Sequence, residues 1–305
     1  MNRTLILLVG AALFFGCAEK KQVLHLYNWA DYMAPEMIAL FEREHNCRVI
    51  EDTFDSNESM YAKLKAGATG YDVIVPSSYM VEIMIKQGML QPLDHAKLTN
   101  LTNVDPDYAH IMLDPDMTYS VPWAVTVTGI AYLSDKLEDP EPTWAVFDRA
   151  DLKGRMTLLN DMRETIGAAL KFLGYSLNST DEVELAQARD VVLGWKRNVA
   201  KFENEQYKTG LASEEFYLVH GYSGDILQVL GENEAITFMM PKEGGSVAMD
   251  EMVIPKGAPN PELAHRFINF MLRPEVAAAN TEFTSYLFPN RASYALLPDE
   301  LRNDP

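Results

Sequence analysis

The chain has 305 residues, of which 48% are hydrophobic and 23% charged, so it is long enough for two lobes that each have a core. Its net charge of −18 argues against binding to nucleic acid or to anionic lipid, and it would attract cations. Acidity also serves solubility, so the charge alone names no ligand.

Residues 1–17 are predicted to be a targeting segment rather than part of the fold. Arg3 supplies a positive start, and the apolar run at 5–15 is too short to span a bilayer. Gly16 and Cys17 end this run in a way that resembles a bacterial lipobox, in which the cysteine is lipidated after cleavage. We therefore expect a lipid-anchored protein, in the periplasm or on the outer face of the cytoplasmic membrane.

The second cysteine, Cys47, would then be the one thiol of the mature chain. It stands at the start of an apolar strand pattern, which favours a buried, inert thiol over a reactive one.

Strand and helix patterns alternate in the next hundred residues. In chain order, we expect a strand at 23–27, a helix at 35–44, a strand at 48–51, a helix at 58–66, a strand at 72–76 and a helix at 79–87. Pro35 suits the first turn of its helix. Such a run predicts a parallel sheet covered by helices on both faces, with right-handed crossovers.

A second unit of the same kind begins with a long β-prone stretch at 119–132. It continues with a strand at 156–159, helices at 163–175 and 181–196, short segments at 218–220, 224–230 and 235–239, a strand at 252–255 and a helix at 261–271. Asn260 is expected to cap that last helix. Two α/β units without a flexible linker indicate two lobes joined by strands that run from one to the other.

Signals for catalysis are weak. The six histidines are dispersed and form no metal motif, and there is no phosphate-binding or dinucleotide-binding loop. The glycines of 221–224 have the wrong spacing for a nucleophile elbow. We expect no enzyme activity, no metal and no cofactor.

Ligand-type side chains follow four of the predicted strands, where open α/β sheets bind ligands. They are Trp29, Asp31 and Tyr32, then Ser77 and Tyr79, then Asp161 and Glu164, and finally Tyr222 and Asp225. Ring faces attract ammonium groups, and carboxylates pair each ammonium that leaves water. Taken singly, Asp225 and Asp250 would be ordinary turn acids. The repetition at several strand ends predicts a site for a small polycation.

Structural roles compete with this interpretation. Trp29 and Tyr32 could belong to the core, and the hydroxyl of Ser77 could cap the following helix. Asp161 and Glu164 have the spacing of an N-cap residue and its partner in the first helical turn, and that role is compatible with binding.

Five stretches in this order resemble the spermidine/putrescine-binding proteins of bacterial ABC importers, over residues 23 to 291. They are Tyr-Asn-Trp-Ala-Asp-Tyr at 27–32, Ser-Asn-Glu-Ser-Met-Tyr-Ala-Lys-Leu-Lys at 56–65, Tyr-Asp-Val-Ile-Val-Pro-Ser-Ser-Tyr at 71–79, Pro-Lys-Glu-Gly-Gly at 241–245 and Ile-Asn-Phe-Met-Leu-Arg-Pro at 268–274.

The resemblance implies a periplasmic-binding-protein type II fold, with two α/β lobes that close on a ligand about two crossover strands near Thr126 and Asp250. Lobe 1 would comprise 22–126 plus 251–296, and lobe 2 would comprise 127–250 plus 297–305. The protein would be a monomer that captures spermidine or putrescine and delivers it to the membrane permease of an ABC importer, touching the membrane only through its lipid anchor.

The resemblance also implies the binding residues. Its aromatic contacts fall on Trp29, Tyr32, Tyr79, Tyr222 and Tyr286, its carboxylates on Asp161, Glu164, Asp225 and Asp250, with Asp31 in some members, and its hydroxyl on Ser77, with Ser223 a weaker candidate.

Three departures from the family pattern bear on selectivity. Tyr222 stands where tryptophan is common, Ala248 where an aromatic residue usually flanks the acid, and Pro305 ends the sequence where relatives continue with a further helical segment. The resemblance therefore implies a class of ligand, not a choice between putrescine and spermidine.

Another organic cation or an amino acid is the alternative ligand. A site for an amino acid needs an arginine that grips the carboxylate. Arg163 is the one arginine within the ligand-type stretches, and we expect it to pair with Asp161 and Glu164 instead. An enzyme would need a perturbed acid–base pair in the cleft.

Overall fold

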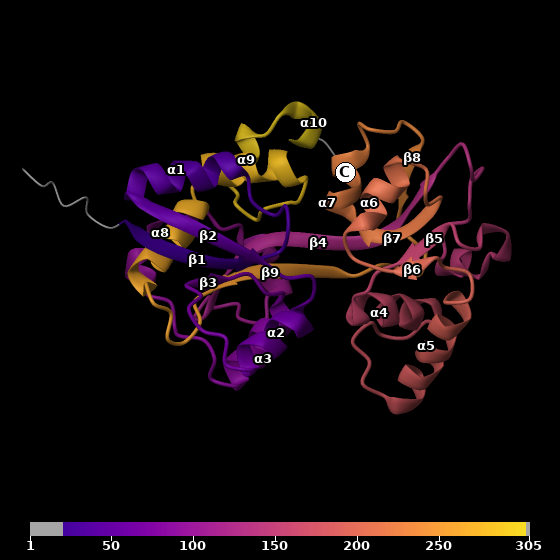
Figure 1. Cartoon of the computed structure of the whole chain (residues 1–305), viewed down its shortest axis with the longest axis horizontal. Helices are drawn as coiled ribbons and strands as arrows, with labels where there is room; N and C mark the ends of the chain where they lie inside the picture. Colours follow the sequence, from indigo (N-terminus) through magenta and orange to yellow (C-terminus); the bar gives the residue numbers. More distant parts are fainter. Residues whose placement is uncertain (1–20, 303–305) are drawn as a thin grey trace, which may run out of the picture.

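The computed structural model describes residues 21–302, which form two α/β lobes connected by two long antiparallel strands (Figure 1). These strands are β4 (Ser120–Leu133) and β9 (Val247–Val253). The first half of β4 pairs with β9, and its second half pairs with strands of the other lobe. β4 therefore belongs to both sheets. The predicted targeting segment with Cys17 lies outside the described residues.

The first lobe is built on a parallel core of three strands, β1 (Gln22–Asn28), β2 (Cys47–Thr53) and β3 (Val73–Ile74), extended by β9 and β4. Its helices are α1 (Pro35–His45), α2 (Asn57–Lys65), α3 (Ser78–Lys86), α8 (Pro261–Met271) and α9 (Pro274–Thr284). α1, α8 and α9 cover one face of this sheet, and α2 and α3 cover the other (Figure 1).

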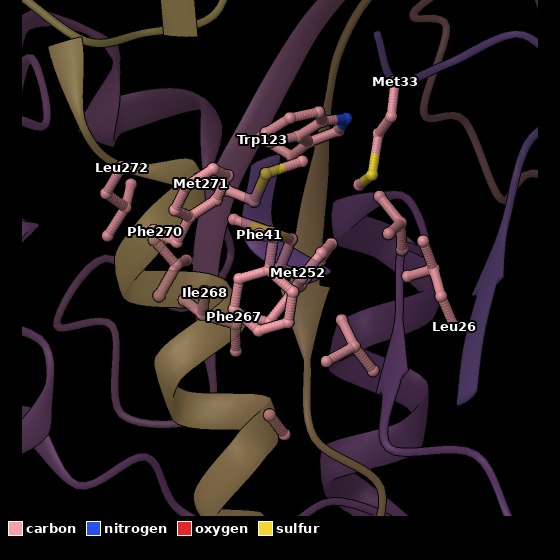
Figure 2. Close-up of a cluster of buried hydrophobic side chains, with 14 of the residues drawn as sticks. Leu26, Met33, Phe41, Trp123, Met252, Phe267, Ile268, Phe270, Met271 and Leu272 are labelled. Carbon is pink, nitrogen blue, oxygen red and sulfur yellow. The ribbon is translucent and has the colours of Figure 1, made fainter. Parts of the chain in front are cut away.

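Aromatic packing holds the first of these faces together (Figure 2). The ring of Phe41 on α1 meets Phe267 and Phe270 of α8 at centroid distances of 5.0 and 5.4 Å. Trp123 of β4 packs at 4.3 Å against Phe288. These edge-to-face contacts add to the burial of large apolar area, so they fix α1 and α8 against the sheet.

The second lobe has a parallel set of short strands, β5 (Met156–Leu158), β6 (Lys201–Phe202) and β7 (Leu218–Tyr222), while β8 (Ile236–Met239) pairs with β4. Its helices are α4 (Met162–Phe172), α5 (Glu182–Trp195), α6 (Gln206–Ala212) and α7 (Ser223–Val229). The last helix of the described chain is α10 (Asp299–Arg302). Buried Trp144 and Trp195 anchor the core of the second lobe.

The α/β fold with two lobes agrees with the prediction, and the following details differ. The sheets are mixed, because β4 runs antiparallel to β7, β8 and β9. β9 begins at Val247, five residues before the predicted strand. Asn260 does precede α8, but its side-chain amide donates to the carbonyl of Val23 at 2.9 Å and makes no cap.

Two further features concern the chain outside the site. Cys47 is a free and buried thiol, as predicted. Within residues 21–302, every helix is too short or too polar to cross a lipid bilayer.

Candidate ligand-binding site

The eleven side chains predicted to bind a ligand all line one cavity of about 510 Å³ between the two lobes. They are Trp29, Asp31, Tyr32, Ser77, Tyr79, Asp161, Glu164, Tyr222, Asp225, Asp250 and Tyr286. They come from the loops after β1 and β3, the starts of α3 and α4, the end of β7, the start of α7, β9 and the segment after α9. The weaker candidate Ser223 is not among the residues that line it.

Asp250 lies on the crossover strand β9 and is only 4% exposed. Its two oxygens accept hydrogen bonds from the hydroxyls of Ser77 at 2.6 Å and Tyr32 at 2.7 Å. The hydroxyl of Ser77 therefore serves Asp250 and does not cap α3. Burial raises the pKa of Asp250 to about 6, because the two hydroxyls compensate the loss of water only in part.

Asp161 and Glu164 occupy the first turn of α4 and combine a capping role with a place in the cavity. A side-chain oxygen of Asp161 accepts from the backbone N–H of Glu164 at 3.1 Å. The carboxylate of Glu164 accepts from the hydroxyls of Thr128, at 2.7 Å, and Ser246. Burial raises the pKa of both acids, and the positive end of the helix dipole does not fully offset it.

Asp225 is held between two phenols. Tyr207 donates to one of its oxygens at 2.6 Å and Tyr286 donates to the other at 3.0 Å. Tyr286 also packs edge to face on Tyr32 at 5.2 Å, so two rings of lobe 1 form one wall, and Tyr286 reaches Asp225 of lobe 2. Tyr207 was not predicted, because nothing in the sequence near position 207 separates a site tyrosine from a core one.

Trp29 has a structural role as well as a face in the cavity. Its indole N–H donates to the carbonyl of Val75 at 2.8 Å, and its ring lies 4.4 Å from that of Phe54. The side chain is half-buried, and its open part lines the cavity. The core and binding interpretations therefore hold together.

The expected pairing of Arg163 with Asp161 and Glu164 is wrong. Arg163 forms none of the salt bridges found in the described chain; its guanidinium donates to Asn178 at 2.7 Å and lies 4.6 Å from the centre of the Tyr79 ring. From the first turn of α4, the side chain extends across the cleft to lobe 1. The phenol of Tyr79 donates to Glu58 at 3.1 Å.

A second cationic side chain, Lys208 on α6, lines the cavity and was not predicted. Its ammonium donates to Gln228 at 3.1 Å and lies 3.7 Å from the carboxylate of Asp31. Asp31 has a φ of 52°, which an aspartate tolerates better than most residues. A lysine in a short helix carries no signal of such a contact.

The cavity is strongly acidic. In the described chain, seven carboxylates line it against Arg163 and Lys208. No salt bridge between described residues involves Asp161, Glu164 or Asp250. Over the same residues, no group of three or more histidine, cysteine or acidic side chains is arranged to hold a metal ion. The arrangement suits an organic cation with apolar segments between its charges.

Comparison with known proteins gives the family of this chain. A family model described as bacterial extracellular solute-binding protein matches residues 36–305. The chain belongs to this family. Its members bind solutes and are not enzymes.

Individual relatives are similar over nearly the whole chain. The putrescine/cadaverine-binding protein of Pseudomonas aeruginosa is 37% identical over 311 residues, covering 97% of this chain and 88% of the relative. A Listeria monocytogenes protein named for a spermidine/putrescine ABC transporter has a TM-score of 0.89 at 39% identity, covering 93% of this chain and 88% of that one. The TpPotD lipoprotein of Treponema pallidum has a TM-score of 0.83 at 38% identity, covering 90% and 88%.

Proposed function

We propose that this solute-binding protein captures a linear polyamine in the cavity between its lobes and delivers it to the permease of an ABC importer. The observation that carries the proposal is the set of three carboxylates, Asp161, Glu164 and Asp250, which face the cavity without a salt-bridge partner among the described residues.

Electrostatics explains why these acids favour a cationic ligand. An ionised carboxylate removed from water costs several kcal/mol unless it is paired. Here hydroxyl and backbone donors supply part of the compensation, and the raised pKa of Asp250 reflects the remainder. An ammonium group next to Asp250 would supply the missing compensation, and the low dielectric of a closed cleft would strengthen the attraction.

The rings supply the complementary contacts. Trp29, Tyr32, Tyr222 and Tyr286 line the cavity beside the acids. Aromatic faces cover methylene segments and attract the ammonium groups at their ends. Alternating charge and hydrocarbon is the pattern of a polyamine, and the relatives are named for putrescine, cadaverine and spermidine.

We further propose the cellular setting and the moving parts. The lobes would divide near Thr126 and Asp250, with β4 and β9 as the hinge on which they close. The mature protein would be a periplasmic or surface monomer anchored through a lipid on Cys17. A lipoprotein among the similar structures supports the anchor.

A binding screen tests the proposed ligand class. Purified protein without the targeting segment is titrated by calorimetry with putrescine, cadaverine, spermidine and spermine, and with arginine and 4-aminobutyrate as zwitterions. We expect one-to-one binding of at least one polyamine, at about micromolar affinity or tighter, near −8 kcal/mol. Binding of a zwitterion alone would refute the polyamine assignment and indicate that the site serves an amino acid.

A further inference from the structure

We propose that Lys208 acts as an internal ammonium group that occupies the Asp31 part of the cavity and thereby makes the site selective for diamines over longer polyamines. The juxtaposition of a lysine and a carboxylate inside a cavity built for cations carries this inference. Asp31 comes from the loop after β1 in lobe 1, and Lys208 comes from α6 in lobe 2.

Two neighbours, Gln228 and Asp31, define the position of the Lys208 ammonium. Its ammonium donates to Gln228 at 3.1 Å and lies 3.7 Å from the carboxylate of Asp31. The amide of Gln228 in turn donates to the carbonyl of Thr284 at 2.7 Å. The lysine side chain is 17% exposed, whereas that of Asp31 is 72% exposed. A chain of polar contacts thus holds the ammonium at the cavity wall.

Stability is a poor explanation for this pair. With Asp31 so exposed and the charges 3.7 Å apart, the pair contributes little to folding. The pair affects ligand binding more than folding, because it places a positive charge where a further ligand ammonium would pair with Asp31. A bound cation near Lys208 would meet repulsion and a carboxylate that is already paired.

Six further acids line the cavity, namely Asp55, Asp161, Glu164, Glu205, Asp225 and Asp250. Asp161, Glu164 and Asp250 lack a salt bridge within residues 21–302; Asp225 lacks one too, and both its oxygens, like those of Asp250, accept hydroxyl hydrogen bonds. Burial, and after it the charge of Asp161, raises the pKa of both Asp250 and Glu164 against partial compensation by hydroxyls. Asp161, Glu164 and Asp250 together can take two ammonium groups, one at Asp250 and one at the start of α4.

A calorimetric comparison of putrescine with spermidine tests the inference. Because it rests on the proposed function, the wild-type protein must first bind a polyamine; binding of none of the four polyamines in the screen would refute that function. Given binding, we expect putrescine to bind the wild type more tightly than spermidine. Tighter binding of spermidine by the wild type would overturn the role of Lys208.

Variants then assign the preference to this side chain. Lys208→Gln should shift the ratio of spermidine to putrescine affinity about tenfold toward spermidine, the effect of one partly screened charge. Lys208→Met is the second variant, should the glutamine variant fail to fold as judged by thermal melting. Adding Asp31→Asn to either should abolish the gain, since the freed carboxylate is then absent.

Lys196→Gln is the matched control, because it removes the same charge from an exposed residue of the same lobe outside the cavity. Its affinity ratio should equal that of the wild type. An unchanged ratio in Lys208→Gln, or the same shift in Lys196→Gln, would show that Lys208 does not set the length of the ligand.

Discussion

Replacing Asp250 by asparagine tests the electrostatic core of the site. The substitution keeps the shape of the side chain and one oxygen acceptor, but it removes the charge that a ligand ammonium would pair with. Truncating one partner of a buried charge pair costs 2–5 kcal/mol, in order of magnitude, and the retained oxygen favours the lower half of that range. We expect a loss of about 3 kcal/mol, or about 150-fold in affinity.

Folding should not suffer in the same variant. Burial raises the pKa of Asp250 from 3.8 to about 6, so at pH 7.5 its ionised form opposes folding of the empty protein. A shift of this size corresponds to about 3 kcal/mol, which asparagine relieves while it disturbs the hydrogen bonds from Ser77 and Tyr32. These effects have opposite signs, and the melting temperature without ligand should change by only a few degrees.

Calorimetry at pH 7.5 with the tightest-binding polyamine measures the loss, and thermal melting without ligand checks the fold. Asp116→Asn serves as the control, because this exposed acid lies outside the cavity and its loss changes the net charge equally. Affinity within threefold of the wild type in Asp250→Asn would refute the reasoning and return Asp250 to the role of a structural acid.

Two other predictions address the rings and the proton balance. Trp29→Leu should weaken polyamine binding by about 1–2 kcal/mol, because the ring face is lost. It should also lower the free energy of unfolding by about 1 kcal/mol, because the hydrogen bond to the carbonyl of Val75 is lost. An unchanged affinity in titrations would confine Trp29 to the core. Affinity should fall about tenfold between pH 7.5 and pH 5, because the free Asp250 carboxyl, with its pKa raised to about 6, must lose its proton to bind an ammonium. Titrations across this range in wild type and Asp250→Asn check it, and equal pH profiles would exclude Asp250 as the source.

Local patterns were sufficient for much of the fold. β1 and α1 follow from apolar spacing and from a proline at the helix start, and the structure places both within one residue of the predicted bounds. The same logic located Trp29 and Ser77, since side chains that follow parallel strands meet at one edge of a sheet. These positions depend on short-range geometry, which the sequence displays directly.

Long-range partners account for what was missed at β9. Two adjacent acids, Asp250 and Glu251, disfavour a strand on propensity alone, so the predicted strand began only at Met252. The structure accommodates both acids because hydroxyls of Ser77 and Ser78, each 173 residues away in the chain, donate to them. No local pattern contains such partners.

Helix α6 was missed for a different reason. It has seven residues and no side-chain cap at Glu205, so its start carries no recognisable signal. Lys208, which lines the cavity, and the buried Tyr207 were missed with it. Their roles depend on Asp225 and on Asp31, and only the folded chain shows these contacts.

A crystal structure of the protein with its tightest-binding polyamine tests the central claim most directly. We expect the ligand in the cavity between the lobes, with one ammonium within hydrogen-bonding distance of Asp250, a second at Asp161 or Glu164, and its methylenes against Trp29. A ligand that lies outside this cavity, or one whose ammonium groups avoid all three carboxylates, would contradict the account.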